Sequence, residues 1–288
     1  MTVSRVIVDQ VNATCEEAAT ANLTTASRRG NVICLDQGAA DDVMIVADIH
    51  GHRVNFERLV RIADLDAHPR RHLIMQEVCH GGPLYPSEAG CMSHLLLEDV
   101  MRLKATYPDR FHFLISNHEL AEMTNFPITK GNRLLNVIFR CGMRELYGSE
   151  TERLRSTYIS FISTCPLAVR LDTGVFICHS APENVDRDGF ETEIFERALQ
   201  EEDFAPSGAV FQLVWGRDFR QENANAFAAL VGAQVLIHGH EPCMNGFNVP
   251  NDKQIILDCC GRRACYLILP LDQTYSQAQM IDLIGHIS

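Results

Sequence analysis

The chain has 288 residues, of which 46% are hydrophobic and 22% are charged, a composition ordinary for a globular protein with a substantial core. The formal net charge of −12 argues against a broad binding surface for nucleic acid or for an anionic membrane. An anionic substrate stays compatible with this charge, because a bound metal cation can reverse the field locally. No stretch is long and apolar enough to span a bilayer, so we expect no membrane partner.

The eleven cysteines are odd in number and scattered, and no pair has C-x-x-C spacing. Reduced thiols explain this usage better than a disulfide framework or a metal site at Cys259, Cys260 and Cys265. The first ten residues lack a basic region followed by an apolar one, as a secretory signal would have. We therefore expect a cytoplasmic protein.

Taken in chain order, residues 1–29 are polar and rich in Ala and Thr, and we expect a short helix or an N-terminal arm outside the core. Residues 30–288 contain no Pro/Gly linker and are expected to form one domain. Its first half alternates two kinds of pattern, with strands expected at 43–46, 72–75 and 111–115 and helices at 55–65, 93–106 and within 131–163. Its second half is richer in strands, expected at 168–171, 175–178, 235–237, 255–257 and 265–269, with a helix at 224–231. These patterns predict an α/β or α+β fold with one large core.

Polar residues follow five of these apolar runs directly, and the same types recur: Asp, His, Glu and Asn. They are Asp48, His50, Glu77, Asn117, His118, His179 and His240. Because strand ends converge at one edge of a sheet, these side chains can meet at a common site. Carboxylates, imidazoles and amide oxygens are ligands for hard or borderline divalent metals, so the sequence predicts a metal site.

Each segment has a simpler explanation when taken alone. In an extended Asp48-Ile49-His50 segment, residues i and i+2 point to the same side and can bind one ion, yet the pattern is also common in surface loops. The carbonyl oxygen of Asn117 can bind a metal while His118 faces a substrate, but Asn117 could equally cap a helix and leave His118 exposed. A single histidine after a strand, such as His179 or His240, is usually structural. The ordered set as a whole is not expected by chance.

In this order the motifs resemble those of the calcineurin-like metallophosphoesterases, specifically the phosphoprotein phosphatase branch. That family runs G-D-x-H-G, G-D-x-x-D-R-G, G-N-H-E, a lone His near H-G-G, and a late G-H. The corresponding segments here lie at 47–51, 76–82, 116–119, 179–181 and 239–240, and the resemblance covers about 43–269. It implies a fold of two packed mixed β-sheets flanked by helices, with metals at the carboxyl ends of strands.

The resemblance also implies a role for each residue. Asp48 and His50 would hold a first metal ion, and Glu77 would bridge to a second ion held by Asn117, His179 and His240. His118 would be the general acid for the leaving group. Two divalent cations would clamp the phosphoryl group and activate a water for attack, and a donor set of imidazole and oxygen favours Mn, Fe or Zn.

The second motif departs from the family pattern at three positions. Glu77 replaces the usual bridging Asp, so the alternatives are a longer bridge or an ordinary acidic residue beside a single metal. His80 replaces the Asp that orients the general acid, and it could accept a hydrogen bond from His118, act as an acid itself or touch the substrate. Gly81 replaces the Arg that grips phosphate, and Arg217, or else Arg220 in the same segment, is our candidate to replace it.

The preferred function is a metal-dependent phosphatase acting on a phosphorylated protein, a nucleotide or a small phosphoester. The alternative is a catalytically weak or inactive module, derived from a phosphatase, that binds metal or protein. A nuclease would use related chemistry, but the acidic balance and the lack of a basic stripe with interleaved aromatics argue against it. The motifs carry no signal for an oligomeric state.

Overall fold

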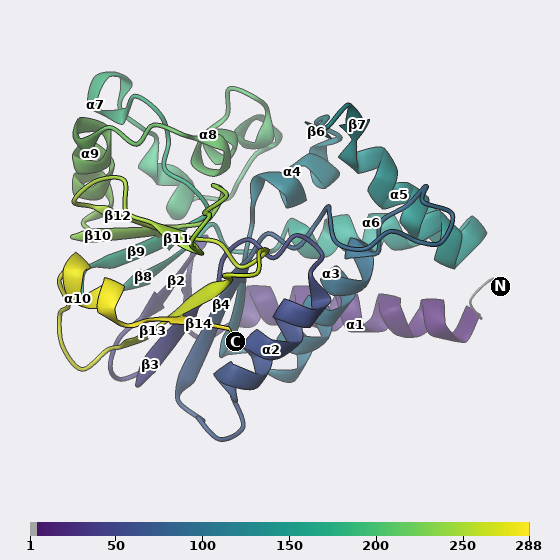
Figure 1. Cartoon of the computed structure of the whole chain (residues 1–288), viewed down its shortest axis with the longest axis horizontal. Coiled ribbons are helices and arrows are strands. Elements are labelled where there is room, and N and C mark those ends of the chain that lie inside the picture. Colours follow the sequence, from purple (N-terminus) through teal and green to yellow (C-terminus); the bar gives the residue numbers. More distant parts are fainter. Residues whose placement is uncertain (1–4, 288) are drawn as a thin grey trace.

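Short apolar strands of this chain pair into two large mixed sheets and one small hairpin in the computed structural model, which describes residues 5–287 (Figure 1). The five-stranded sheet has the order β14-β13-β3-β4-β5. Its strands are β3 (Asp42–Ile45), β4 (Arg71–Gln76), β5 (Phe111–Leu114), β13 (Cys265–Pro270) and β14 (Ile284–His286). Strands β3, β4 and β5 are parallel, whereas β13 and β14 are antiparallel to their neighbours.

The seven-stranded sheet has the order β1-β2-β8-β9-β10-β12-β11, and β9, β10 and β12 are parallel. Its strands are β1 (Arg28–Arg29), β2 (Val32–Leu35), β8 (Ala168–Leu171), β9 (Val175–Cys178), β10 (Val235–His238), β11 (Phe247–Asn248) and β12 (Gln254–Leu257). A separate hairpin joins β6 (Thr129–Lys130) to β7 (Arg133–Leu134). The expected class of two packed mixed sheets flanked by helices is confirmed.

Ten α-helices lie among the described residues, and most of them cover the outer faces of the two sheets (Figure 1). They are α1 (Arg5–Thr24), α2 (Arg53–Ala63), α3 (Ser93–Thr106), α4 (Asn117–Thr124), α5 (Leu135–Tyr147), α6 (Thr151–Ile162), α7 (Val185–Asp188), α8 (Ala209–Trp215), α9 (Gln221–Val231) and α10 (Gln277–Asp282). Short 3₁₀ turns lie at Gly148–Glu150, Thr192–Phe195 and Glu201–Phe204. Within residues 5–287, no helix has the length and apolar character needed to cross a bilayer.

The strands have two buried faces, and this explains why they appear as continuous apolar runs. In β3, Val43 and Ile45 belong to the core between the sheets, whereas Met44 and the following Val46 belong to the larger core under the helices. Successive side chains of a strand point to opposite faces, so one run supplies both cores. The pattern therefore indicates strands that are covered on both sides.

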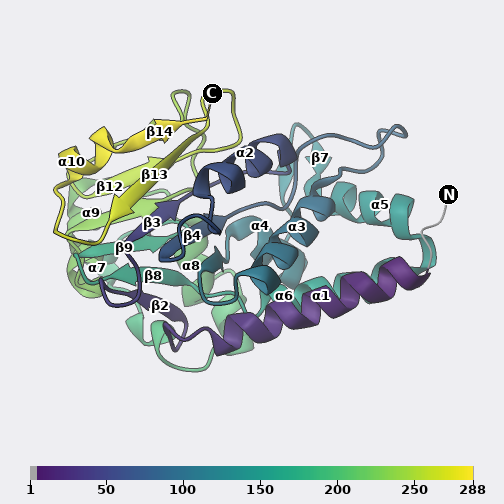
Figure 2. The same ribbon diagram turned by 90° about the horizontal axis from the view of Figure 1, so that it is seen from below.

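Helix α1 differs from our expectation of an arm outside the core. It runs along α3 and α6 (Figure 2), and Val8, Cys15 and Ala18 are buried in the larger core. The buried stripe follows a helical spacing but consists mainly of small residues, so its hydrophobic signal in the sequence is weak. Residues 1–4 of the expected arm lie outside the described part of the chain.

The parallel strands bring the predicted ligands to one edge of the molecule. Asp48 follows β3, Glu77 follows β4 and Asn117 follows β5 in the first sheet, while His179 follows β9 and His240 follows β10 in the second. Because these strands run parallel within each sheet, their carboxyl ends share an edge. The site therefore lies where the two sheets meet.

Candidate metal centre

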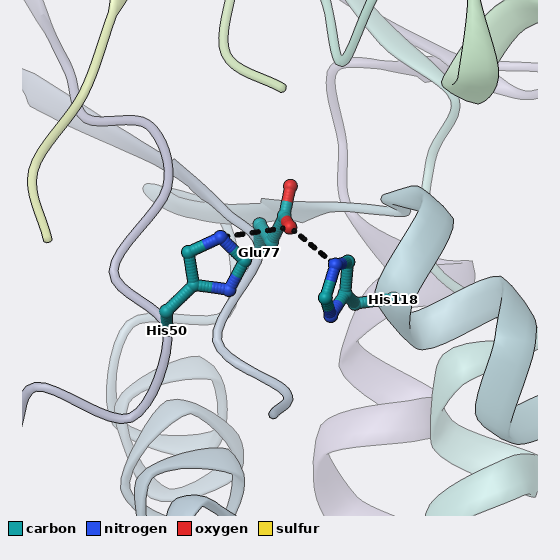
Figure 3. A group of neighbouring side chains, drawn as sticks. All are labelled: His50, Glu77 and His118. Atoms are coloured by element: carbon teal, nitrogen blue, oxygen red, sulfur yellow. Dashed lines mark ion pairs between the residues drawn. The ribbon is translucent and has the colours of Figure 1, made fainter. Parts of the chain in front are cut away.

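The outer part of the site is formed by two imidazoles that face one carboxylate. His50 Nε2 lies 3.2 Å from Glu77 Oε1, and His118 Nε2 lies 3.3 Å from the same oxygen (Figure 3). The donor atoms of these three residues lie within 4.8 Å of one another. His50 lies in the loop between β3 and α2, whereas His118 lies in the first turn of α4.

The inner part of the site is formed around the other oxygen of the same carboxylate. His179 Nε2 lies 2.8 Å from Glu77 Oε2 and 2.8 Å from Asn117 Oδ1. His240 Nδ1 lies 3.2 Å from Asn117 Oδ1. The donor atoms of Glu77, His179 and His240 also lie within 4.8 Å of one another. Glu77 is thus common to two groups of donors.

Hydrogen bonding around His179 fixes which of its ring nitrogens has a free lone pair. Burial lowers the pKa of His179 to about 3, so its ring is neutral at ordinary pH. Its Nδ1 lies 2.9 Å from Gln76 Oε1, an acceptor, and therefore carries the hydrogen. The lone pair of Nε2 then faces Glu77 Oε2 and Asn117 Oδ1, two further acceptors.

When Glu77 is ionised, these three electron-pair donors meet with no hydrogen between them and repel one another, and a cation would remove that repulsion. The same conclusion follows from hydrogen-bond geometry, since Glu77 Oε2 and His240 Nε2 are buried atoms that have no hydrogen-bond partner among the described residues. The close approach of Glu77 Oε2 to His179 is therefore a contact without a hydrogen bond. The residues present fit a divalent metal site.

Asp48 lies beside this group but outside the two clusters of donors. Its Oδ1 accepts the backbone N–H of His240 at 2.9 Å. Burial, and next the charge of Glu77, raise the pKa of Asp48 well above its usual value. Burial also raises the pKa of Glu77, to about 7. Two buried carboxylates that disfavour each other's charge form a site that attracts a cation.

The loops that carry these side chains adopt an unusual backbone conformation. Positive φ angles occur at His50 (45°), Glu77 (51°), His80 (63°) and His240 (71°), and such angles cost non-glycine residues on the order of 1–3 kcal/mol each. Glu119 holds one of these loops, because its Oε1 accepts the N–H groups that follow Glu77 at 3.0 and 2.7 Å. The surrounding fold thus maintains the strained residues at the site.

The start of α4 decides between the two interpretations of Asn117. The N-cap is Ser116, whose Oγ accepts the N–H of His118 at 3.2 Å and that of Glu119 at 3.5 Å. Asn117 is the first helical residue, and its side chain points to His179 and His240 instead. The interpretation of Asn117 as a helix cap is therefore wrong.

Behind His118 lies a chain of hydrogen bonds that the sequence did not suggest in full. His118 Nδ1 lies 2.8 Å from His80 Nδ1, and His80 Nε2 lies 3.0 Å from Glu122 Oε1. Glu122 lies four residues after His118 on α4, a spacing that places both on one face of the helix. That spacing was the available signal for Glu122. Gln76, which fixes the proton on His179, had no such signal because its partner lies 103 residues away.

A cleft of about 420 Å³ opens over these residues. Arg217 lines it and forms an ion pair with Glu241. Arg220, the other candidate for binding phosphate, is engaged by Asp186 and Asp218 and does not line the cleft. The β6–β7 hairpin adds a cation to the rim that sequence reasoning did not identify, namely Lys130.

His238 has a structural position beside the site. Its Nδ1 lies 3.1 Å from the backbone oxygen of Cys178, and this carbonyl can only accept, so His238 donates from Nδ1. The residue belongs to neither group of donors around Glu77. It thus supports the ends of β9 and β10 beneath the site.

Comparison with known proteins gives the family. A family model described as calcineurin-like phosphoesterase matches residues 42–244, and the chain belongs to this family. It is therefore a phosphoester hydrolase of a metal-dependent class, as its motifs predicted. Comparison of the sequence with curated proteins gives no match.

Solved structures with the same fold are distant in sequence. One is a protein serine/threonine phosphatase from Saccharomyces cerevisiae with similarity to human phosphatase PP5, which has a TM-score of 0.71 and 15% identity over 97% of this chain and 89% of that chain. Another is the cold-active protein-tyrosine phosphatase of a psychrophilic Shewanella species, with a TM-score of 0.58 and 13% identity over 85% of this chain and 78% of that chain. At this level of identity the two matches establish the fold.

Proposed function

We propose that the protein is a phosphatase with a binuclear metal centre held by Asp48, His50, Glu77, Asn117, His179 and His240. The observation that carries the proposal is that, when Glu77 is ionised, the lone pairs of His179 Nε2, Glu77 Oε2 and Asn117 Oδ1 meet without a hydrogen between them. The two oxygens of Glu77 face different imidazoles, and this supports a bridging role for the longer side chain.

Two bound divalent cations would neutralise charge on the phosphoryl group and lower the pKa of a water molecule there. The donor set of three imidazoles with carboxylate and amide oxygens favours Mn, Fe or Zn. Manganese is the ion we would supply first in an assay.

His118 is our general acid. Its Nε2 faces the cleft beside Glu77 Oε1, where the leaving oxygen of a bound ester would come within reach of a proton. As a bond forms between water oxygen and phosphorus, the bond from phosphorus to the leaving oxygen breaks. The leaving oxygen then takes the Nε2 proton of His118 and departs as an alcohol.

Arg217 and Lys130 are the cations of the cleft that could hold the substrate's phosphoryl oxygens in place of the arginine that Gly81 replaces. We rank Arg217 first, because its ion pair with Glu241 holds the guanidinium at the cleft wall. Phosphomonoesters are the first substrates to test, since both solved structures described above are named as protein phosphatases. A nucleotide or another small phosphoester would fit the same chemistry.

The test is hydrolysis of p-nitrophenyl phosphate and bis-p-nitrophenyl phosphate with added Mn²⁺. We expect turnover of the monoester that is abolished by Asp48→Asn and reduced about 10²–10⁴-fold by His118→Asn. Asp252→Asn, which removes an exposed carboxylate outside the cleft, is the matched control and should keep full activity. Equal rates for the wild-type protein and Asp48→Asn would refute the proposal and favour the binding module.

The cytoplasm is the compartment that we propose. All eleven cysteines are free thiols, and seven of them are buried, an arrangement that suits a reducing compartment. Fractionation of the native host cell tests this point, and recovery of the chain from an extracellular fraction with oxidised cysteines would contradict it.

A further inference from the structure

Glu122 is a buried carboxylate with three cationic or donor partners. Its Oε1 lies 3.0 Å from His80 Nε2, while Oε2 lies 3.3 Å from Arg140 Nε and 3.7 Å from Arg155 Nε. Burial acts to raise the pKa of Glu122, but the hydrogen bond from His80 and the two guanidinium charges outweigh it, and the pKa lies below its usual value. The side chain is therefore an ionised carboxylate that can only accept hydrogen bonds.

The carboxylate fixes the first hydrogen bond of the chain. His80 must donate from Nε2 to Glu122, because a carboxylate can only accept. His118 Nδ1 lies 2.8 Å from the other ring nitrogen of His80, Nδ1, so the hydrogen bond between the two rings is held in place by Glu122. The remaining ring nitrogen of His118, Nε2, is left facing Glu77 and the cleft.

We propose that Glu122 is a positioning residue, which acts through His80 to fix the orientation of His118. The proposal rests on the function proposed above, in which His118 is the general acid. In the family pattern, an Asp at the position of His80 contacts the general acid directly. Here His80 lies between the general acid, His118, and the buried carboxylate of Glu122.

The surroundings of His80 exclude its other possible roles. Both of its ring nitrogens are occupied, and its side chain is 1% exposed, so it has no atom left for a substrate. Phe139 packs edge-on against its ring, with a centroid distance of 5.6 Å and an interplanar angle of 87°. This packing and the hydrogen bond to Glu122 together hold the ring of His80 beside His118.

The relay from Glu122 through His80 to His118 needs no proton transfer of its own. When the leaving oxygen takes the proton of His118 Nε2, His80 keeps its Nε2 hydrogen towards Glu122. If the carboxylate were lost, the ring of His80 would lose the partner that holds it. His118, whose Nδ1 lies 2.8 Å from His80 Nδ1, would then lose its support and turn out of position.

Glu122→Gln tests the proposal, because the amide keeps the shape but can donate towards His80. We expect kcat for p-nitrophenyl phosphate to fall about 10–10³-fold, with a much smaller change in KM, since a general acid that is no longer held in position impairs the chemical step. Glu122→Asp should recover part of the loss. Glu98→Gln is the matched control, as Glu98 is also a buried carboxylate of the same core, held by Tyr147 and Tyr158, but it does not contact His80.

A double-mutant cycle separates positioning from a general loss of structure. In a protein that already carries His118→Asn, the change Glu122→Gln should reduce the residual rate less than twofold, since the residue that Glu122 orients is absent. A full further loss in that background would show a structural role and overturn the proposal. A wild-type rate in Glu122→Gln alone would overturn it as well.

The position of the ring hydrogen on His80 can be measured without any turnover. In ¹⁵N-histidine NMR of the metal-free protein, we expect His80 to carry its hydrogen on Nε2, with His80→Asn used to assign its signals. Glu122→Gln should shift the hydrogen towards Nδ1. Finding the Nδ1 form in the wild-type protein would refute the relay even in an active enzyme. An inactive wild-type protein with the expected tautomer would instead refute the phosphatase function and leave the relay in place.

Discussion

Removing the negative charge of Glu77 should stabilise the metal-free protein at alkaline pH. Burial raises the pKa of this carboxyl from its usual 4.5 to about 7, so between these values the folded chain keeps a proton that the unfolded chain has released. Stability due to this group is therefore complete below pH 4.5 and is lost as the pH rises to 7. At about 1.4 kcal/mol per pKa unit, the loss is about 3 kcal/mol.

Glu77→Gln cannot lose that stability, because an amide does not ionise. We expect the variant to be about 3 kcal/mol more stable than the wild-type protein at pH 8 in EDTA, and equally stable at pH 4.5. Urea unfolding followed by the fluorescence of Trp215, the single tryptophan, measures the difference at each pH. Mn²⁺ at a thousand times its Kd should reverse the order, since it stabilises the wild-type protein by about 4.1 kcal/mol.

Glu122→Gln is a control for which we expect the opposite change in the free energy of unfolding at pH 8. The pKa of Glu122 lies below its usual value, so its carboxylate contributes stability above pH 4.5 that disappears as the pH falls further. This variant should be less stable than the wild-type protein at pH 8. If Glu77→Gln were also destabilised at pH 8 in EDTA, Glu77 would not be an uncompensated buried charge, and the argument for a cation site would fail.

Three further predictions follow from other parts of the molecule. Arg217→Ala should raise KM for p-nitrophenyl phosphate about tenfold, whereas Arg220→Ala, outside the cleft, should leave KM unchanged, and steady-state kinetics compare the two. Burial lowers the pKa of His72 to about 4, so stability should fall by about 3 kcal/mol as the pH drops from 6.5 to 4, and His72→Gln should reduce this dependence in urea unfolding. Phe161→Ala should cost about 3–5 kcal/mol of unfolding free energy in the same assay, because this fully buried ring packs against Phe113.

The sequence predicted the parts of the fold and the site that depend on local pattern. Strands such as 168–171 and 175–178 lie where the apolar runs placed them, because a strand buried on both faces leaves a continuous signal. The predicted ligands meet because parallel strands end at one edge, so a polar residue after each run was sufficient to find them. These features need no knowledge of distant contacts.

The features that the sequence did not predict depend on contacts between distant segments. Gln76 orients His179 across the two sheets, and Glu119 holds the strained loop at Glu77, but neither pairing leaves a trace in a single sequence. The positive φ of Glu77 opposes the preference of its residue type and exists only because the loop is held there. Helix α1 was misjudged because its buried face consists of small side chains.

The central claim is a binuclear metal centre, and counting the metals tests it most directly. Elemental analysis of the purified protein, loaded with Mn²⁺ and then dialysed, should give two ions per chain. Glu77→Ala should retain one ion or none, while Asp252→Asn should retain both. Two ions in Glu77→Ala would contradict the bridging role of this carboxylate, and no bound metal in the wild-type protein would contradict the metal centre itself.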